Sequence, residues 1–323
     1  MKVACQLCGD TTDCTRCTQC HVVFYCSDRH QREHLAEHQS LCALVQTAIR
    51  RLDKEERRLR REEGNDVFEE DVGHFWSIFE TRDYMRAKNR LIMVMHEVGT
   101  PTALQIALEE GMDCLRLCRG DNVGMRHTVP AFMLRLGDVQ DCYDFIKWWA
   151  TCDREVAYNW GDLDLPYLDI KDADMTEPVK IFEGAPLEHL VALTFIKLHI
   201  ALGLLDVIHA ELASLALPFG LEGELKSFLP MNELISAPMT VQKLFQTMLS
   251  QAKEAFSMVH EHNAYFWKAV LDPEAMLQTQ PTPFYCTGSP EEVRQMFQRY
   301  YQLWTDHPAA MAFVKKNLQE HAL

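Results

Sequence analysis

The feature that most constrains this chain is a cluster of cysteine and histidine residues within its first 42 positions. Of the 12 cysteines in the 323-residue sequence, seven lie in this stretch. A unit of this size is too small to fold on a hydrophobic core alone, so it needs a second source of stability. Eight of its residues form consecutive pairs at short intervals: Cys5-x2-Cys8, Cys17-x2-Cys20, Cys26-x3-His30 and His38-x3-Cys42.

These residue types and spacings predict two bound zinc ions. Zinc in proteins prefers four Cys or His ligands arranged as a tetrahedron. A C-x2-C pair on a tight turn presents two thiolates to one side, and residues four apart share one face of a helix. Four pairs supply two complete ligand sets with no open coordination position, which is typical of structural zinc. Metal binding then provides the folding free energy, although spacing alone does not decide which pairs share an ion.

Three further residues of this stretch are also able to bind a metal. Cys14 forms a competing C-x2-C pair with Cys17, and it remains an alternative ligand although its use would break the regular spacing. We expect His21 and His34 to face solvent or to pack against neighbouring side chains.

The cysteine content indicates the cellular compartment of the protein, and the net charge indicates which classes of partner it is suited to bind. No apolar signal segment precedes Cys5, so we expect a reducing, intracellular location, cytoplasmic or nuclear, where clustered cysteines bind metal. The net charge is −15, and the acidity lies in residues 64–323, with 21 basic and 37 acidic side chains. Such a chain is poorly suited to nucleic acid. The most apolar stretch, 187–217, contains charges, Lys197 among them, which indicates a buried helix and no membrane span.

Beyond the cysteine cluster the apolar periodicity is helical. We predict a mainly α fold with three parts: a zinc-binding unit over residues 1–42, a charged, solvated connecting helix over 43–66, and an irregular array of helical hairpins over 67–323. An acidic irregular segment over 153–178 interrupts this array and is expected to lie as a solvated surface loop. The predicted helices of the array are 84–98, 102–117, 129–136, 139–150, 187–217, 241–262, 290–305 and 308–318.

The order of the metal-binding residues resembles a MYND-type zinc finger. The matching string is Cys5-x2-Cys8-x8-Cys17-x2-Cys20-x4-Tyr25-Cys26-x3-His30-Gln31-x2-His34-x3-His38-x3-Cys42. In that family the first and third pairs bind one ion, and the second and fourth pairs bind the other. The resemblance therefore implies one zinc held by Cys5, Cys8, Cys26 and His30, and a second held by Cys17, Cys20, His38 and Cys42.

Two positions depart from the usual finger. His30 stands where most members have Cys, and imidazole is also a zinc ligand. Leu35 stands where most members have Trp; in related fingers that Trp and the Gln matching Gln31 help to dock proline-rich peptides, and whether Leu35 permits such binding is left open. Segments 119–124, 129–137, 143–149 and 165–169 also resemble the uncharacterised helical part of MYND-finger proteins from fungi and other eukaryotes, which implies no activity.

Two hypotheses of function remain. The sequence lacks the motifs of SET methyltransferases, 2-oxoglutarate oxygenases, hydrolases and nucleotide-binding proteins, so we name no catalytic residue and expect an adaptor. Its finger and helical body would each offer a surface to a protein or peptide. The alternative is an enzyme or small-molecule binder in the helical body, with the finger as an accessory. Residues that would line such a pocket, or instead form buried polar pairs, are Arg119, Asp121, Asn122, Arg126, Arg135 and Trp160.

Overall fold

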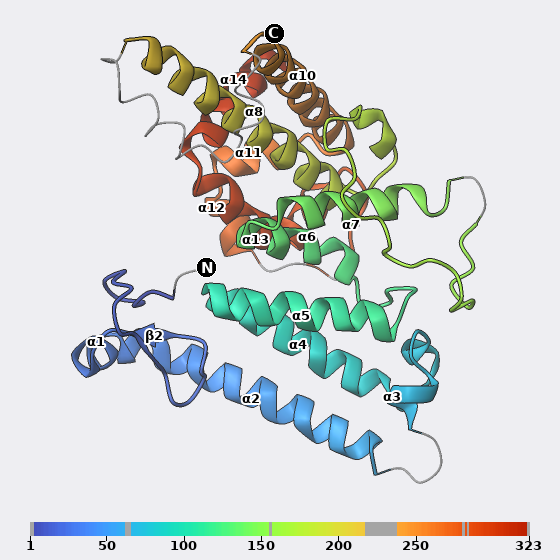
Figure 1. Cartoon of the computed structure of the whole chain (residues 1–323). Coiled ribbons are helices and arrows are strands. Elements are labelled where there is room, and N and C mark those ends of the chain that lie inside the picture. The colour runs from blue at the N-terminus through green and yellow to red at the C-terminus, as the bar shows by residue number, and fades with distance from the viewer. Residues whose placement is uncertain are drawn as a thin grey trace. The chain divides into compact units, whose positions relative to one another are not determined.

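The computed structural model describes residues 3–61, 66–154, 157–216, 238–279, 282 and 284–321. This part of the chain is mainly α-helical, as predicted, with one short two-stranded sheet (Figure 1). The chain divides into two compact units: Met1–Asp138 with Glu155–Asp169, and Val139–Arg154 with Ile170–Leu323. The domain boundaries after residues 42 and 66 remain a prediction. The connecting helix was predicted to extend to residue 66, but it ends at Leu59, and Asp66 instead caps the next helix.

The first unit begins with a small β-hairpin and two helices. Strands β1 (Thr15–Arg16) and β2 (Phe24–Tyr25) pair antiparallel, with Thr15 opposite Tyr25. Helix α1 (Asp28–Glu33) starts where the Ser27 side chain accepts a hydrogen bond from the His30 backbone N–H, a standard N-cap. Helix α2 (Leu35–Leu59) follows after one residue. Together these elements place the eight predicted ligands.

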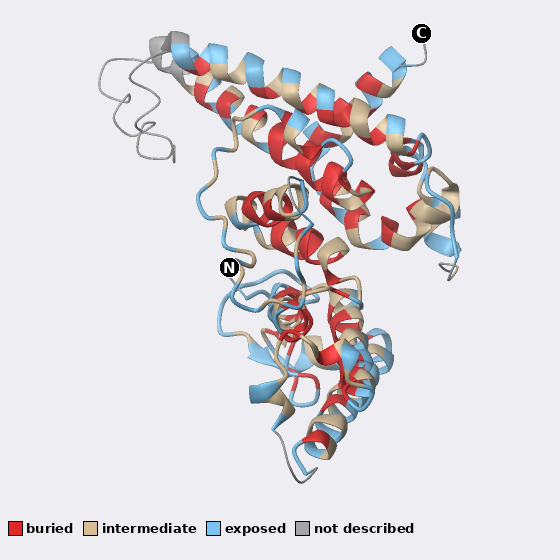
Figure 2. Ribbon diagram, turned by 90° about the vertical axis from the view of Figure 1, so that its right-hand side faces the viewer, coloured by how far each residue is buried: buried red, intermediate tan, exposed pale blue. Residues whose placement is uncertain are grey.

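Helix α2 is longer and more buried than a solvated connector. It begins at Leu35, eight residues before the predicted start, and therefore includes His38 and Cys42. Its buried side chains Val45, Ala48 and Leu52 recur at helical spacing and form the face of α2 that packs on α4. Figure 2 shows buried and exposed positions on different sides of the long helices. Because the apolar stripe is narrow and the charges are many, the sequence suggested a helix exposed on all sides.

The rest of the first unit is a set of short and medium helices. Helices α4 and α5 form a hairpin whose turn contains Gly99 at φ +70°, and the Thr100 hydroxyl caps α5 by accepting from the Ala103 backbone N–H at 3.2 Å. The elements are α3 (Val67–Glu70), a 3₁₀ turn (Phe75–Ser77), α4 (Arg82–Val98), α5 (Pro101–Leu117), a 3₁₀ turn (Met125–His127) and α6 (Val129–Leu136).

The second unit is built around its two longest helices, α8 and α10, which pack against each other (Figure 1). Its aromatic core contains Trp267 edge-on to Trp304, with ring centroids 4.8 Å apart. The elements are α7 (Val139–Thr151), a 3₁₀ turn (Val179–Phe182), α8 (Leu187–Ala216), α10 (Pro238–His262), α11 (Phe266–Leu271), α12 (Glu274–Gln278), α13 (Pro290–Thr305) and α14 (Pro308–His321).

Helix α8 includes a segment, Leu187–Ala210, that is long and apolar enough to cross a membrane by length and composition. In the structure 61% of its most apolar window is buried, and α8 packs against α7, α10 and α14. Lys197 lies within this segment and is itself fully buried. The core helices of globular proteins have these properties.

Candidate metal centre

Each C-x2-C pair lies on a tight turn of the same construction. The Gly9 backbone N–H donates to the Cys5 carbonyl oxygen at 2.9 Å, and the His21 N–H donates to the Cys17 carbonyl oxygen at 3.0 Å. The residue after the second cysteine has a left-handed backbone in both turns, with φ +73° at Gly9 and +62° at His21. Glycine adopts this conformation at no steric cost, whereas His21 is held there at some cost. The two turns therefore present their thiols alike.

The other two pairs come from the hairpin and the helices. Cys26 directly follows β2, and His30 lies in the first helix, α1. His38 and Cys42 are one turn apart on α2, so their side chains share one face of the helix. Each cluster therefore combines one C-x2-C pair from a tight turn with one pair that lies in or next to a helix.

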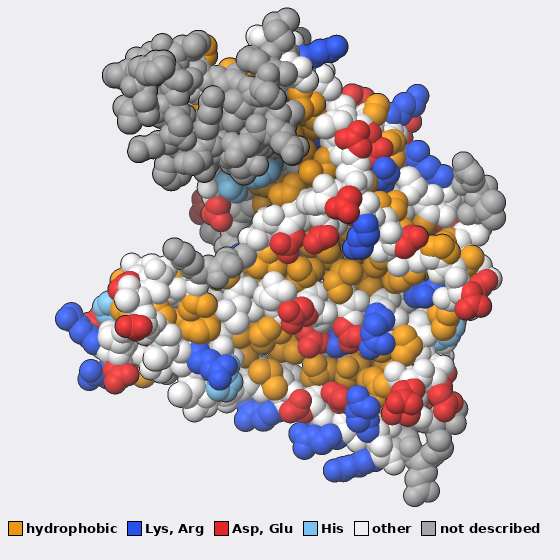
Figure 3. All heavy atoms as spheres, in the orientation of Figure 1, with side chains coloured by type: hydrophobic (Ala, Val, Ile, Leu, Met, Phe, Trp, Pro, Cys, Tyr) orange, Lys and Arg blue, Asp and Glu red, His pale blue; other side chains and the backbone are white. Residues whose placement is uncertain are grey.

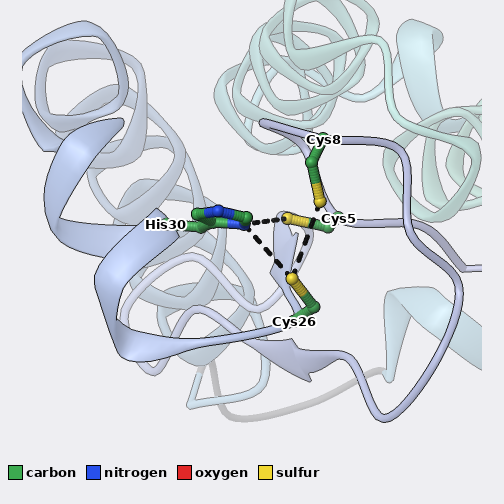
Figure 4. Close-up of side chains that lie close together, drawn as sticks. All are labelled: Cys5, Cys8, Cys26 and His30. Carbon is green, nitrogen blue, oxygen red and sulfur yellow. Dashed lines mark hydrogen bonds between the residues drawn. The ribbon is translucent and has the colours of Figure 1, made fainter.

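The first cluster brings together Cys5, Cys8, Cys26 and His30, whose ligand atoms all lie within 4.8 Å of one another (Figure 4). The Cys8 and Cys26 sulfurs are 3.6 Å apart, and Nδ1 of His30 lies 3.2 Å from the Cys26 sulfur. Around a tetrahedral zinc, sulfur–sulfur distances are about 3.8 Å and nitrogen–sulfur distances about 3.6 Å. The cluster has the dimensions of a zinc site.

The second cluster brings together Cys17, Cys20, His38 and Cys42, again within 4.8 Å. The Cys17 and Cys42 sulfurs are 3.9 Å apart, and Nε2 of His38 lies 3.4 Å from Cys17 and 3.6 Å from Cys20. All four residues are buried here, whereas the first cluster has an exposed member, Cys8. The two clusters contain the same residues as the two zinc sites that the family resemblance implies, in which the first pair joins the third and the second joins the fourth. Direct binding of zinc by each residue remains a prediction.

The first cysteine of each turn has a thiol pKa below its usual value. Burial acts to raise the pKa of Cys5, but hydrogen bonds from the backbone N–H groups of Cys26 and Cys8 outweigh it and bring the pKa to about 6. Burial also opposes ionisation of Cys17, and backbone N–H groups, foremost that of Cys20, lower its pKa. In each site the first cysteine is therefore the thiol whose ionisation the backbone favours, and a thiolate is the form that binds a metal cation.

Three other thiols, those of Cys20, Cys26 and Cys42, have a raised pKa and resist ionisation without a cation. Burial raises the pKa of Cys26 to about 11 and that of Cys42 to about 12, and neighbouring thiolates add to the increase. A divalent cation at the centre of the cluster lowers these pKa values because it neutralises the negative charge of the neighbouring thiolates. Metal binding therefore releases the thiol protons. The donor sets fit zinc, which when bound supplies the cross-links that hold the finger together.

The three spare residues of the finger take other roles. Cys14 lies outside both clusters, and its thiol donates to the Asp10 carbonyl oxygen at 3.1 Å. His21 is exposed, as expected. His34 is half-buried, and its Nδ1 is hydrogen-bonded to the Tyr25 hydroxyl at 2.9 Å. Burial raises the pKa of Tyr25, so this hydroxyl stays protonated. Tyr25 thereby supports the helices that carry the ligands.

The polar residues around Arg119 serve to hold the backbone. Arg119 donates to the carbonyl oxygens of Asp162 and Leu165 at 3.3 and 3.2 Å. Asp121 is buried and accepts from the backbone N–H groups of Met125 and Arg126 at 2.7 and 2.8 Å. These contacts fit the interpretation of buried polar pairs.

Arg135 has the same kind of role, because its Nη2 donates to the Gly99 carbonyl oxygen at 3.5 Å, while its Nη1 lies 3.1 Å from Nδ1 of His96. A cavity of about 330 Å³ does lie beside Arg119, between Arg116 and Tyr167. Of the six residues predicted to line a pocket here, Arg119 lines it, and the described lining does not include Asp121, Asn122, Arg126, Arg135 or Trp160.

The acidic segment is anchored by residues that the sequence did not single out for this role. The buried Asp144 carboxylate of α7 accepts from the backbone N–H groups of Asp172 and Ala173 at 2.8 and 2.9 Å. Nζ of Lys197 donates to the carbonyl oxygens of Met175 and Glu177 at 2.6 and 2.7 Å. The available signal was a charged residue within a predicted apolar helix, since such a residue needs a buried partner.

Comparison with known proteins assigns the N-terminal part of the chain. Residues 5–42 match the family model of the MYND finger. No curated protein and no solved structure matches the chain at a significant level. The matched range begins at Cys5 and ends at Cys42, the outermost residues of the two clusters. The finger therefore has two zinc sites and binds two structural zinc ions.

Proposed function

We propose that this chain, whose residues 5–42 form a MYND finger, is a zinc-stabilised adaptor that binds protein partners. MYND fingers commonly act as protein-interaction modules. The observation that carries the proposal is that both clusters have four closely spaced donors, which leaves the metal no position for a substrate. Zinc then stabilises a surface, and recognition belongs to the side chains that the finger exposes.

The finger exposes apolar side chains beside its second helix. Leu35, at the start of α2, is 52% exposed, and Leu7 and Leu44 are also exposed. Leu35 and Leu44 are nine residues apart and so lie on opposite faces of α2. An apolar peptide segment would bury Leu35, and the half-buried Gln31, four residues earlier, offers an amide for its backbone. On the face drawn in Figure 3, basic and acidic side chains are interspersed, which favours a protein partner over nucleic acid. We propose that binding takes place inside the cell.

The helical part of the first unit offers a second surface. Phe79 is 73% exposed, and the guanidinium of Arg82 lies 5.6 Å from its ring centroid and 5.7 Å from that of Trp76. The guanidinium of Arg86 also lies near the Trp76 ring, 5.6 Å from its centroid. Trp and Arg are the residue types that contribute most to protein interfaces. An adaptor requires two such surfaces.

The test compares single substitutions in the full chain. Leu35→Asp places a favourable charge at the first residue of α2, so the helix is preserved while the apolar surface is lost. We expect it to abolish capture of a partner identified with the unmodified chain, whereas Leu277→Asp, at an exposed position of α12, keeps capture. Both variants should retain two zinc ions. Equal capture by Leu35→Asp and by the unmodified chain would contradict the proposal.

A second candidate function rests on the cavity of about 330 Å³ beside Arg119. It lies within the usual size range of ligand sites, and it combines Arg116 with the apolar Met112 and Leu163. A small-molecule binder would show saturable ligand signals that Met112→Trp removes by filling the space. Absence of any such ligand with intact partner binding would leave the adaptor function alone.

A further inference from the structure

A separate cavity of about 460 Å³ lies in the second unit, and its lining residues come from α10, α11 and α14. Its volume falls within the range of small-molecule sites. Leu271 and Leu318 contribute apolar surface to it. One wall rests on stacked rings: Trp267 lies on Phe256 with centroids 4.5 Å apart, and His321 lies on the other part of this stack, 5.6 Å from Phe256.

The ionisable side chains that line this cavity are basic, and Gln319 is a neutral polar residue beside them. Lys268 and Lys315 line it together with His260 and His321, and the described lining includes no carboxylate. This is unusual in a region whose overall charge is strongly negative. Glu320 follows a lining residue in sequence, but it pairs with Lys253 at 3.4 Å and does not line the cavity.

The two histidines that line the cavity, His260 and His321, differ in their hydrogen bonds. Nε2 of His321 lies 3.0 Å from the Ser257 hydroxyl, and the two imidazole rings are 5.2 Å apart. Nδ1 of His260 is buried, and no group among the described residues forms a hydrogen bond with it. Because this atom is buried, it does not face the open cavity, and the charged groups available to a ligand there are the exposed side chains of Lys268 and Lys315.

We propose that this cavity binds an amphipathic carboxylate, a small molecule with an anionic head and a hydrocarbon tail. The tail lies against Leu271, Leu318 and the aromatic wall, where it is removed from water. The carboxylate is held by Lys268 and Lys315, which supply charge-assisted hydrogen bonds. A neutral ligand would leave both ammonium groups unused, and a cationic ligand would be repelled by them.

The experiment measures binding of decanoate to the full zinc-loaded chain by calorimetry and by tryptophan fluorescence. Trp267 does not line the cavity, but it stacks on Phe256, which in turn stacks on the lining residue His321, and it serves as the reporter. Decyltrimethylammonium, with the same tail and the opposite charge, is the matched ligand. We expect decanoate to bind at one site and the cation to bind at least about tenfold more weakly, the factor that corresponds to one charge-assisted contact.

The variant pair isolates the lysines. Lys268→Met with Lys315→Met keeps the hydrocarbon stems and removes both charges, so the affinity for decanoate should fall about tenfold or more. Lys316→Met, the exposed neighbour on the same helix that does not line the cavity, should leave the affinity unchanged. Circular dichroism of each variant shows whether the helices are retained.

Several results would overturn the proposal. They are equal affinity for the two ligands, undiminished decanoate binding in the double variant, and equal loss in Lys316→Met. Binding to anionic phosphatidylserine vesicles without binding of monomeric decanoate would assign the lysines to a membrane surface and also overturn it. None of these outcomes affects the adaptor proposal, because capture of a protein partner is measured through Leu35.

Discussion

Cys14 and Cys20 lie close together in sequence, but the fold gives their sulfur atoms different environments. Cys20 is 1% exposed and its sulfur lies 3.6 Å from Nε2 of His38, within the second cluster. Cys14 is half-exposed, and its thiol donates to a backbone carbonyl. A thiol engaged in this way stabilises a loop and contributes nothing to a metal site.

Substitution of these two cysteines should therefore change the zinc content differently. Cys20→Ser removes one of four ligands of a buried site, and we expect the zinc content to fall from two ions per chain to one. Cys14→Ser should keep two. Metal analysis of the purified, dialysed proteins measures both, and loss of zinc on Cys14→Ser would show that the competing C-x2-C pair is used.

Lys197 makes the stability of the second unit depend on pH. Burial lowers its pKa from the usual 10.5 to about 8, against the opposing charges of Glu177 and Asp174. Between about pH 8 and 10.5 the unfolded chain binds more protons at this residue than the folded chain, so stability rises with pH in this window. Below pH 8 the lysine is charged in both states and the full cost of burying the charge remains.

The pH effect is measured as a difference between proteins. We expect the free energy of unfolding of the unmodified chain, minus that of Lys197→Met, to increase by about 3 kcal/mol between pH 8 and 10.5. Urea unfolding at several pH values gives both quantities, and the subtraction removes the contributions of other titrating groups. A constant or falling difference would show that Lys197 is charged in the folded state throughout.

At the level of single residues, the sequence indicates those whose partners are close along the chain. The ligands form four short pairs, and each pair is read directly from its spacing. Asp144 and Lys197 bind backbone atoms 20 or more residues away, so only the fold identifies their partners. The pairing of Cys17 with Cys42 is also distant, and family resemblance supplied that interleaving, not the spacing.

At the level of elements, α7 holds the last part of the acidic segment, around Asp172 and Ala173, within the second unit. The segment has no regular hydrogen-bonded structure of its own in the described residues, so its backbone groups need partners. Asp144 satisfies two of them, and Gln140, one turn earlier on α7, donates to both Asp144 and the Ala173 carbonyl oxygen. The loop is thereby tied to a helix at one defined position.

Removal of this anchor should destabilise the second unit. Asp144→Ala removes the buried carboxylate acceptor of two part-buried backbone N–H groups, and we expect the free energy of unfolding to fall by about 2 kcal/mol. Asp141→Ala, at an exposed position of the same helix, should change it by less than about 0.5 kcal/mol. Chemical unfolding compares the two, and equal effects would show that Asp144 acts only through helix charge.

Helix prediction succeeded where local signals were complete. Helix α13 has Ser289 as its cap and Pro290 at its first position, and its predicted and observed bounds agree. Helix α11 spans six residues, too few for the apolar periodicity to emerge, and it was not predicted. The cavity proposed for the amphipathic carboxylate is partly lined by α11, so no sequence pattern could have located it.

At the level of the whole molecule, the zinc ions belong to one of two compact units. The Thr100 hydroxyl donates to the Val22 carbonyl oxygen at 2.6 Å, which ties the finger to the turn between α4 and α5 in the first unit. The second unit contains neither cluster. Loss of zinc should therefore affect the first unit and spare the second.

Hydrogen exchange after zinc removal tests this division. We expect a chelator to remove the protection of amides in the finger and α2, to weaken protection in α4 and α5, and to leave α8, α10 and α13 unchanged, because metal binding supplies folding free energy only to the unit that holds it. Added zinc should restore the original pattern. Loss of protection throughout the chain would show that the two units unfold together.

Helix α2 also fixes an angular relation between the metal and the core. His38 and Cys42 lie at its beginning, and Val45, Ala48 and Leu52 continue along it to the face that packs on α4. One residue inserted between Cys42 and Val45 would rotate these two faces by about 100° relative to each other. Insertions of about seven residues, two full turns, would nearly restore the phase. A finger transplanted from another protein is therefore compatible with this body only if its last ligand enters the helix at the same rotational phase.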